Sequence, residues 1–136
     1  MKLNREKRLI CLLLFCLAAT GCGGKSEATK FSATLQATEL AREFKTDKNR
    51  AHKTYAGERA RVAGKVSSII AAPDGTFALT FRTSVYSFTP TRCHFNTTES
   101  RGLSSIKSNE EITVIGTVIG FDDAENLIVL EDCGQL

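Results

Sequence analysis

Two stretches of the chain share one pattern: Val62-Ala63-Gly64-Lys65-Val66 and Val114-Ile115-Gly116-Thr117-Val118. In both, valines and a central glycine occupy alternate positions, which is the period-two spacing of a strand with one buried face. A glycine between two inward-facing valines allows a strand to bend sharply where a small barrel turns a corner. The two stretches therefore predict neighbouring strands that curve together around one core.

The same alternation predicts five strands, over residues 60–70, 76–82, 86–95, 112–121 and 127–132. Asp74-Gly75 supplies the turn of the first hairpin. Between the third and fourth strands, residues 99–106 allow one or two helical turns, in which Leu103 and Ile106 are spaced to close one end of a barrel. This order of elements predicts the OB-fold, a five-stranded, partly open Greek-key barrel. An antiparallel sandwich is the alternative.

A helical segment precedes the strands. Its apolar residues recur at helical spacing and Gly57 ends it; they are Ala37, Leu40, Ala41, Phe44, Ala51 and Tyr55. Lys48 interrupts this stripe and Asp47 could cap a second helix, so a break near Thr46 is expected. The sequence thus predicts a mainly β domain over residues 35–136, with helix at its N-terminal side.

The first residues have the features of an export signal. Basic residues precede an apolar run over residues 9–19; they are Lys2, Arg5, Lys7 and Arg8. That run is too short for a spanning helix, which needs roughly 20 residues. Ala19-Thr20-Gly21-Cys22 resembles the lipobox of bacterial lipoproteins, in which the cysteine is lipidated. An ordinary signal peptide cut nearby and a buried amphipathic start are the alternatives.

The lipobox resemblance implies a layout and a location. Residues 1–21 would be removed, Cys22 would carry the lipid, and residues 22–34 would form a flexible tether to a membrane of the cell envelope. Because residue 23 is glycine and not aspartate, lipoprotein sorting favours the outer membrane, facing the periplasm, if the host has two membranes.

The remaining cysteines fit an oxidising compartment. Cys11 and Cys16 lie in the expected signal, which leaves Cys93 and Cys133 as an even pair in the domain. A disulfide between them would close a loop of about 40 residues and contribute on the order of 4 kcal/mol. Reduced, packed thiols are the alternative. No metal site is expected, because His94 adjoins Cys93 and neighbouring strand residues point to opposite faces.

Charge argues against a nucleic-acid partner. The whole chain carries a formal net charge of +3, but the part from Cys22 onward has equal numbers of basic and acidic residues. A neutral domain lacks the positive field that drives nonspecific nucleic-acid binding. Nucleic acid is therefore an unlikely partner, although other OB-folds bind single strands by stacking bases on aromatic residues beside a basic groove.

A family resemblance covers residues from Thr38 to the C-terminus. This region is similar to a family of bacterial OB-fold lipoproteins named after the anticodon-binding OB domain of transfer-RNA synthetases. The residues that carry it are Glu39-Leu40, Ala51, Tyr55-Ala56-Gly57, the two valine–glycine stretches, Cys93-His94-Phe95, residues 103–107 and Leu130-Glu131-Asp132-Cys133. The resemblance implies fold and compartment but no established activity.

The sequence favours a non-catalytic binding module. In an OB-fold the second and third strands form an open face, so Arg82, Tyr86, Phe88 and Arg92 are the candidate contacts for a protein, peptide or glycan. Tyr86 and Phe88 could instead belong to the core.

An enzyme is the least favoured class. Its strongest support is a set of acidic residues: Glu110-Glu111, Asp122-Asp123 and Glu125. These residues lie at strand ends and turns, and no nucleophile, phosphate-loop or metal motif accompanies them. No cofactor is expected.

Overall fold

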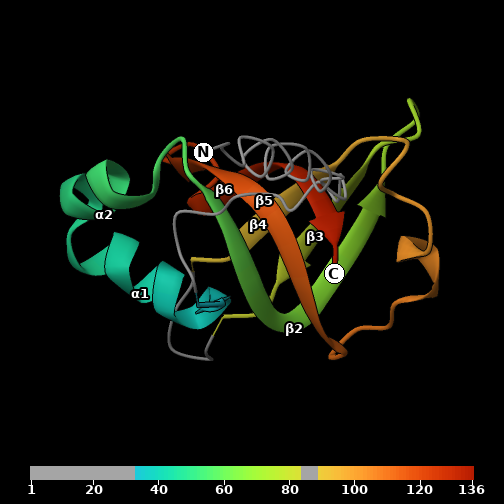
Figure 1. Cartoon of the computed structure of the whole chain (residues 1–136), viewed down its shortest axis with the longest axis horizontal. Helices are drawn as coiled ribbons and strands as arrows, with labels where there is room; N and C mark the ends of the chain where they lie inside the picture. Colours follow the sequence, from blue (N-terminus) through green and yellow to red (C-terminus); the bar gives the residue numbers. More distant parts are fainter. Residues whose placement is uncertain (1–32, 84–88) are drawn as a thin grey trace, which may run out of the picture.

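The computed structural model describes residues 33–83 and 89–136. In chain order the elements are β1 (Leu35–Gln36), α1 (Ala37–Thr46), α2 (Lys48–Tyr55), β2 (Arg59–Ala71), β3 (Phe77–Phe81), β4 (Thr91–Phe95), the 3-10 helix η1 (Leu103–Ser105), β5 (Glu111–Asp122) and β6 (Leu127–Gln135). Helices α1 and α2 lie at one end of the β structure and η1 lies at the other (Figure 1).

The five long strands close into a barrel. Their order is β2-β3-β4-β6-β5, and a further pairing of β5 with β2 completes the circle. Among these five strands, all pairings are antiparallel except that of β4 with β6. This pair is parallel because the chain crosses the end of the barrel between β4 and β5. This is the strand order expected of an OB-fold, so the predicted fold class is confirmed. The two-residue strand β1, which pairs with β2 in parallel, was not predicted.

The two valine–glycine stretches lie on neighbouring strands, as predicted. β2 and β5 pair from Arg59↔Thr117 to Lys65↔Glu111. All four valines of the two stretches are buried in the core.

The presence of glycine at positions 64 and 116 is explained better by a lack of space for a side chain than by a bend in the strand. An ideal Cβ on Gly64 would lie 3.0 Å from both the Ala37 Cβ and a Phe81 ring carbon, and one on Gly116 would lie 2.7 Å from the Cys133 Sγ. A register irregularity does occur at Gly116, between Ile115 and Thr117, but the irregularity on β2 comes only after Val66. The expectation that Gly64 bends its strand is therefore corrected.

The helical segment breaks where the sequence suggested. Asp47 separates the two helices, and its carboxylate accepts a hydrogen bond of 3.0 Å from the Arg50 N–H, which caps α2. Each helix buries its apolar stripe against the barrel, with Leu40 and Phe44 of α1 almost fully buried. None of the helices in the described residues is long and apolar enough to span a membrane.

Three predicted boundaries were wrong. Strand β4 begins at Thr91, so residues 89 and 90 are not in the sheet; Pro90 has no N–H to donate to a neighbouring strand. The last strand continues to Gln135, beyond the expected end at residue 132. Only Leu103–Ser105 of the expected helix over residues 99–106 is helical, because Gly102 enters it with a φ of 91°. Leu103 nevertheless closes the barrel end as expected, fully buried in the core.

Candidate ligand-binding face

The outer surface of β3 and β4, the second and third strands of the barrel, forms the face that OB-folds use for ligands, and the second half of β2 extends this face because it pairs with β3. Strand register places its side chains in two rows, Ser68–Thr80–Arg92 and Ile70–Ala78–His94. These six residues are called the outer face below. On β3 and β4 these side chains alternate with buried core residues, and on β2 Ser68 and Ile70 flank the partly buried Ile69. Ile70 is 58% exposed, one of three large apolar side chains of the described chain that are exposed.

Arg92 is held by a neighbouring turn. Its guanidinium Nη1 forms an ion pair with Glu125, which lies in the turn between β5 and β6. The Nε atom of Arg92 is buried without a hydrogen-bond partner. The pair connects this turn to the outer face and neutralises the positive charge in the described part of that face.

The four sequence-predicted contacts are not brought together as one described site. Arg92 lies on the outer face, whereas Arg82 follows the end of β3 and is exposed beside a hollow of about 270 Å³ that Lys65 and Glu111 also line. Tyr86 and Phe88 lie outside the described residues. Whether these four residues contact a ligand stays a prediction.

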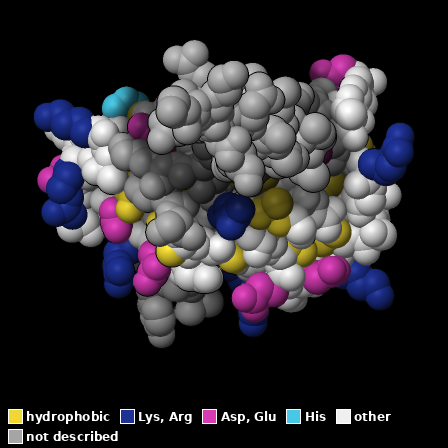
Figure 2. Space-filling view, viewed as in Figure 1, with side chains coloured by type: hydrophobic (Ala, Val, Ile, Leu, Met, Phe, Trp, Pro, Cys, Tyr) yellow, Lys and Arg dark blue, Asp and Glu magenta, His cyan; other side chains and the backbone are white. Residues whose placement is uncertain are grey.

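The described part of this surface lacks features of a nucleic-acid groove. Phe77 and Phe121 are half-buried and the other described phenylalanine and tyrosine side chains are buried, so none of these offers a base a fully exposed stacking surface; the outer face presents only the imidazole of His94. Phe121 is moreover covered by the Lys48 ammonium, 4.2 Å from the ring centre. On the side seen in Figure 2, basic and acidic side chains are interspersed.

Most of the acidic residues that could suggest an enzyme have structural partners. Asp122 accepts hydrogen bonds from the N–H groups of Ala124 and Glu125, at 2.8 and 3.1 Å, and thereby forms the turn after β5. Asp123 pairs with Lys48 of α2.

The remaining acidic residues do not form a metal site. Glu110 accepts a hydrogen bond of 3.0 Å from the Lys107 N–H. His94 is exposed while Cys93 is buried, as strand alternation predicted. Across residues 33–83 and 89–136 no group of His, Cys, Asp and Glu is arranged to hold a metal ion.

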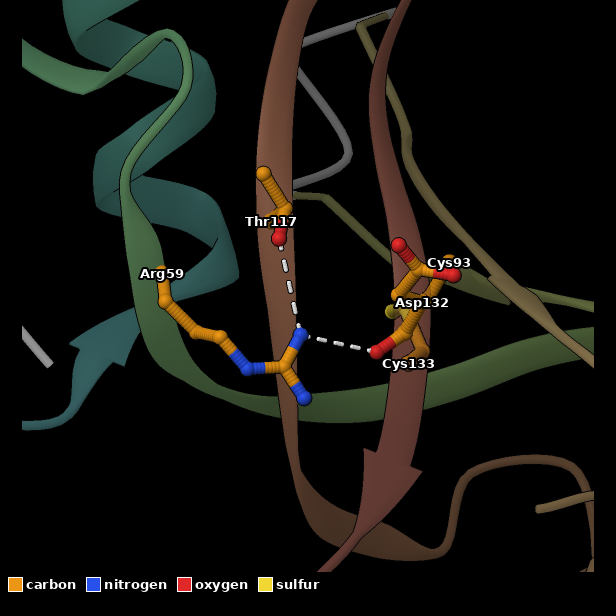
Figure 3. Close-up of a disulfide and its surroundings, with 5 residues drawn as sticks. All are labelled: Arg59, Cys93, Thr117, Asp132 and Cys133. Atoms are coloured by element: carbon orange, nitrogen blue, oxygen red, sulfur yellow. Dashed lines mark hydrogen bonds between the residues drawn. A yellow bond between two sulfur atoms is a disulfide. The ribbon is translucent and has the colours of Figure 1, made fainter. Parts of the chain in front are cut away.

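A disulfide joins Cys93 of β4 to Cys133 of β6 (Figure 3). Their Cα atoms are 6.0 Å apart and both side chains are fully buried. Next to it, Arg59 reaches across β5: its Nη1 donates to the Asp132 carbonyl at 2.9 Å and to the Thr117 hydroxyl at 3.5 Å (Figure 3). Asp132 has a φ of 50°, in the left-handed region, so this hydrogen bond supports an unfavourable backbone conformation beside the disulfide.

One tyrosine has a strongly shifted pKa. Burial raises the pKa of Tyr55 to about 12, and its hydroxyl donates a hydrogen bond of 2.8 Å to the Glu43 carboxylate, which adds to the shift. This contact joins α2 to α1 and lies away from the outer face. It stabilises the helical pair and gives no indication of catalysis.

Sequence reasoning missed a second hollow, of about 260 Å³, near η1. Its lining residues come from β2, β3 and the segment around η1: Val66, Ser68, Ile69, Ala71, Phe77, Leu103, Ser104, Ile106 and Ser108. The spacing of Leu103 and Ile106 indicated that this segment approaches the barrel. It could not indicate the space left beside it.

A family model described as tRNA_anti-like matches residues 9–134. The chain belongs to the tRNA_anti-like family. This confirms the resemblance to anticodon-binding OB domains seen in the sequence. No curated protein matches the chain.

Two solved structures show what the tRNA_anti-like barrel resembles. A candidate nucleic acid-binding lipoprotein from Klebsiella pneumoniae subsp. pneumoniae MGH 78578 is 17% identical with a TM-score of 0.64, over 76% of this chain and 91% of that one. A candidate aspartyl-tRNA synthetase from Leishmania major Friedlin is 11% identical with a TM-score of 0.54, over 82% of this chain and 22% of the synthetase. At these identities the similarity shows a common fold.

Proposed function

We propose that the protein is a non-catalytic binding module of the cell envelope that takes a protein or peptide partner on the outer face. The observation that carries this proposal is the chemistry of that face. It presents an exposed isoleucine, small polar side chains and an arginine already paired with Glu125. Such a mixture of an apolar anchor with neutral polar neighbours is typical of protein interfaces, whose centres are depleted in charge.

Envelope location forms part of the proposal. It is supported by the lipobox-like Ala19-Thr20-Gly21-Cys22 and by the similarity to a lipoprotein from Klebsiella pneumoniae. Lipid on Cys22 would hold the domain at a membrane through the short segment before β1. A Cys22→Ser protein should therefore move from the membrane to the soluble fraction. Retention of that variant in membranes to the wild-type extent would contradict lipid anchoring.

Single-stranded nucleic acid is the second candidate partner. The observation that favours it is the similarity to a lipoprotein named as a candidate nucleic-acid binder, together with a family named for anticodon recognition. Against it stand the balanced charge of the chain from Cys22 onward and the pairing of Arg92 with Glu125. Without several free cations, a surface gains little from releasing the counterions of phosphates.

Catalysis is not part of the proposal. Three of the acidic side chains already have partners. Asp122 accepts hydrogen bonds from N–H groups of its turn, Asp123 pairs with Lys48, and Glu125 pairs with Arg92. Each carboxylate therefore has a structural role. The face therefore offers a surface for contact, with no pair of free carboxylates that could act as acid and base.

The test compares two exposed isoleucines. Immobilised full-length protein is incubated with nuclease-treated envelope extract, and the retained proteins are compared between Ile70→Asp and the control Ile119→Asp, which alters an exposed residue of β5. We expect Ile70→Asp alone to lose the retained protein. In parallel, single-stranded oligonucleotides at low salt should give no gel shift. A shift that weakens steeply as salt rises would replace the protein partner with nucleic acid.

A further inference from the structure

The second half of β2 has one open edge. β2 pairs with β5 only from Arg59 to Lys65, while its pairing with β3 continues to Ala71. Beyond Val66, whose backbone still bonds to residues 109 and 110, the strand therefore has a neighbouring strand on one side only. An unpaired strand edge presents backbone N–H and C=O groups to whatever lies beside it.

Along β2, alternate residues form backbone hydrogen bonds with β3, and this alternation identifies which backbone N–H and C=O groups are free. The Ala72 N–H donates to the Thr76 carbonyl at 2.8 Å, so residues 70 and 68 also bond to β3 while residues 69 and 71 point away. In the described part of the chain, the backbone groups of Ile69 and Ala71 form no backbone hydrogen bond on the side of β2 that faces away from β3. Two donors and two acceptors, at alternate residues, are available for one more strand.

Ile69 and Ala71 line one wall of the 260 Å³ hollow, and the segment around η1 forms the other. The walls meet at Val66, whose carbonyl accepts from the Asn109 N–H at 2.7 Å and whose N–H donates to the Glu110 carbonyl at 2.8 Å. This hollow is called the groove below. Figure 1 shows the end of β2 and η1 at the same end of the barrel, away from α1 and α2.

The groove has an apolar floor, and none of its lining residues is charged. Ile69, Phe77 and Ile106 are partly buried and pack against the core, so an apolar side chain placed there would extend an existing cluster. Residues 66–72 and 103–109 contain one charged residue, Lys107, and it is exposed. The Glu110 carboxylate accepts a hydrogen bond from the Lys107 N–H, so this single cation is offset and provides too little charge to hold a nucleic-acid backbone.

We propose that an extended segment of a partner protein binds here as an added strand. This rests on the proposed function and specifies how the partner is held. The segment would exchange hydrogen bonds with Ile69 and Ala71 and insert an apolar side chain between Ile69 and Ile106. In strand addition, main-chain hydrogen bonds supply affinity and side-chain pockets supply selectivity.

Amide hydrogen exchange in the full-length protein tests the geometry. In the free protein, the amides of Ile69 and Ala71 should exchange at least about tenfold faster than those of Ser68 and Ile70, which bond to β3. The probe is an acetylated and amidated peptide of alternating valine and threonine between aspartates. Adding it should slow the two edge amides at least about tenfold and leave the β3-facing amides unchanged. Unchanged edge amides at saturating peptide would overturn the proposal.

Two variants and a control locate the binding. Ala71→Pro removes one edge donor without touching the β3 ladder, and Ser104→Phe fills the groove from the opposite wall. Each should weaken peptide binding at least about tenfold, whereas Thr98→Phe, which adds the same ring to an exposed residue outside the groove, should not. Equal binding by all variants would contradict the groove as the site.

The extract experiment separates the two proposals. If wild-type protein retains a partner that Ile70→Asp loses, but Ala71→Pro and Ser104→Phe retain it equally, then strand addition is wrong and the outer face remains the site. If wild-type protein retains nothing, the proposed function fails. If light scattering shows a dimer that Ala71→Pro dissociates, the occupant of the edge is a second copy of this chain, and the peptide proposal is overturned.

Discussion

An ideal Cβ on Gly116 would lie 2.7 Å from the Cys133 Sγ, closer than such atoms ever approach. The glycine of the second valine–glycine stretch therefore leaves the space in which the Cys93–Cys133 disulfide lies. One short segment of β5 thus combines two requirements, because its valines build the core and its glycine admits the disulfide.

Replacing Gly116 should destabilise the protein through the disulfide. Gly116→Ala overpacks the core, so we expect the free energy of unfolding to fall by about 2–3 kcal/mol, measured by urea denaturation. In a Cys93→Ala/Cys133→Ala background the same substitution should cost at least about 1 kcal/mol less, since the sulfur is gone. Gly64→Ala, which meets Ala37 and Phe81 instead, is the control and should cost the same in both backgrounds.

Removing the disulfide should cost about 2–4 kcal/mol of unfolding free energy, because it closes a long loop between β4 and β6. Both sulfurs are fully buried, so mild reductant should not release thiols from the folded protein. Thiol labelling during a denaturant titration measures this. Release of two thiols in the absence of denaturant would contradict the buried position of the bond.

Tyr55 should make stability fall at high pH. Its pKa is raised to about 12 in the folded protein from the ordinary value of 10.0, so the folded state holds this proton more tightly than the unfolded state. Its contribution is complete below pH 10.0 and is lost as the pH rises toward about 12. Subtracting the ultraviolet titration of Tyr55→Phe from that of wild type gives its pKa directly; a value near 10 would refute the buried, Glu43-bonded hydroxyl.

Lys48 should contribute modestly to docking of α2. Its ammonium pairs with Asp123 and lies over the ring of Phe121, but the two charged side chains are largely exposed. A double-mutant cycle of Lys48→Ala with Asp123→Ala should give a coupling of about 0.5 kcal/mol that shrinks as salt is added. A coupling that does not change with salt would contradict a solvent-exposed ion pair.

The fold was predictable because its signals are local. Alternating valines placed β2 and β5 in one core, and Asp47 marked the break between the helices. The start of β4 at Thr91 was missed, although Pro90 is a local signal for it. These features depend on side-chain period and on the presence of a backbone N–H, both of which can be read residue by residue.

The site was less predictable because it depends on long-range contacts. The pairing of Arg92 with Glu125 joins residues 33 positions apart. The groove exists because β2 extends beyond the residues that pair with β5. Neither relationship has a local sequence pattern. Arg82 is exposed just after β3, but its contact with a ligand stays a prediction, and Tyr86 and Phe88 lie outside the described residues.

The central claim is that a protein partner binds the surface that carries Ile70. Photocrosslinking in intact cells, from a photoreactive residue at position 70 or at position 119 of the full-length protein, tests it most directly. We predict that mass spectrometry will identify a protein joined at position 70 and absent at position 119. Equal adducts from both positions, or adducts to nucleic acid alone, would contradict the claim.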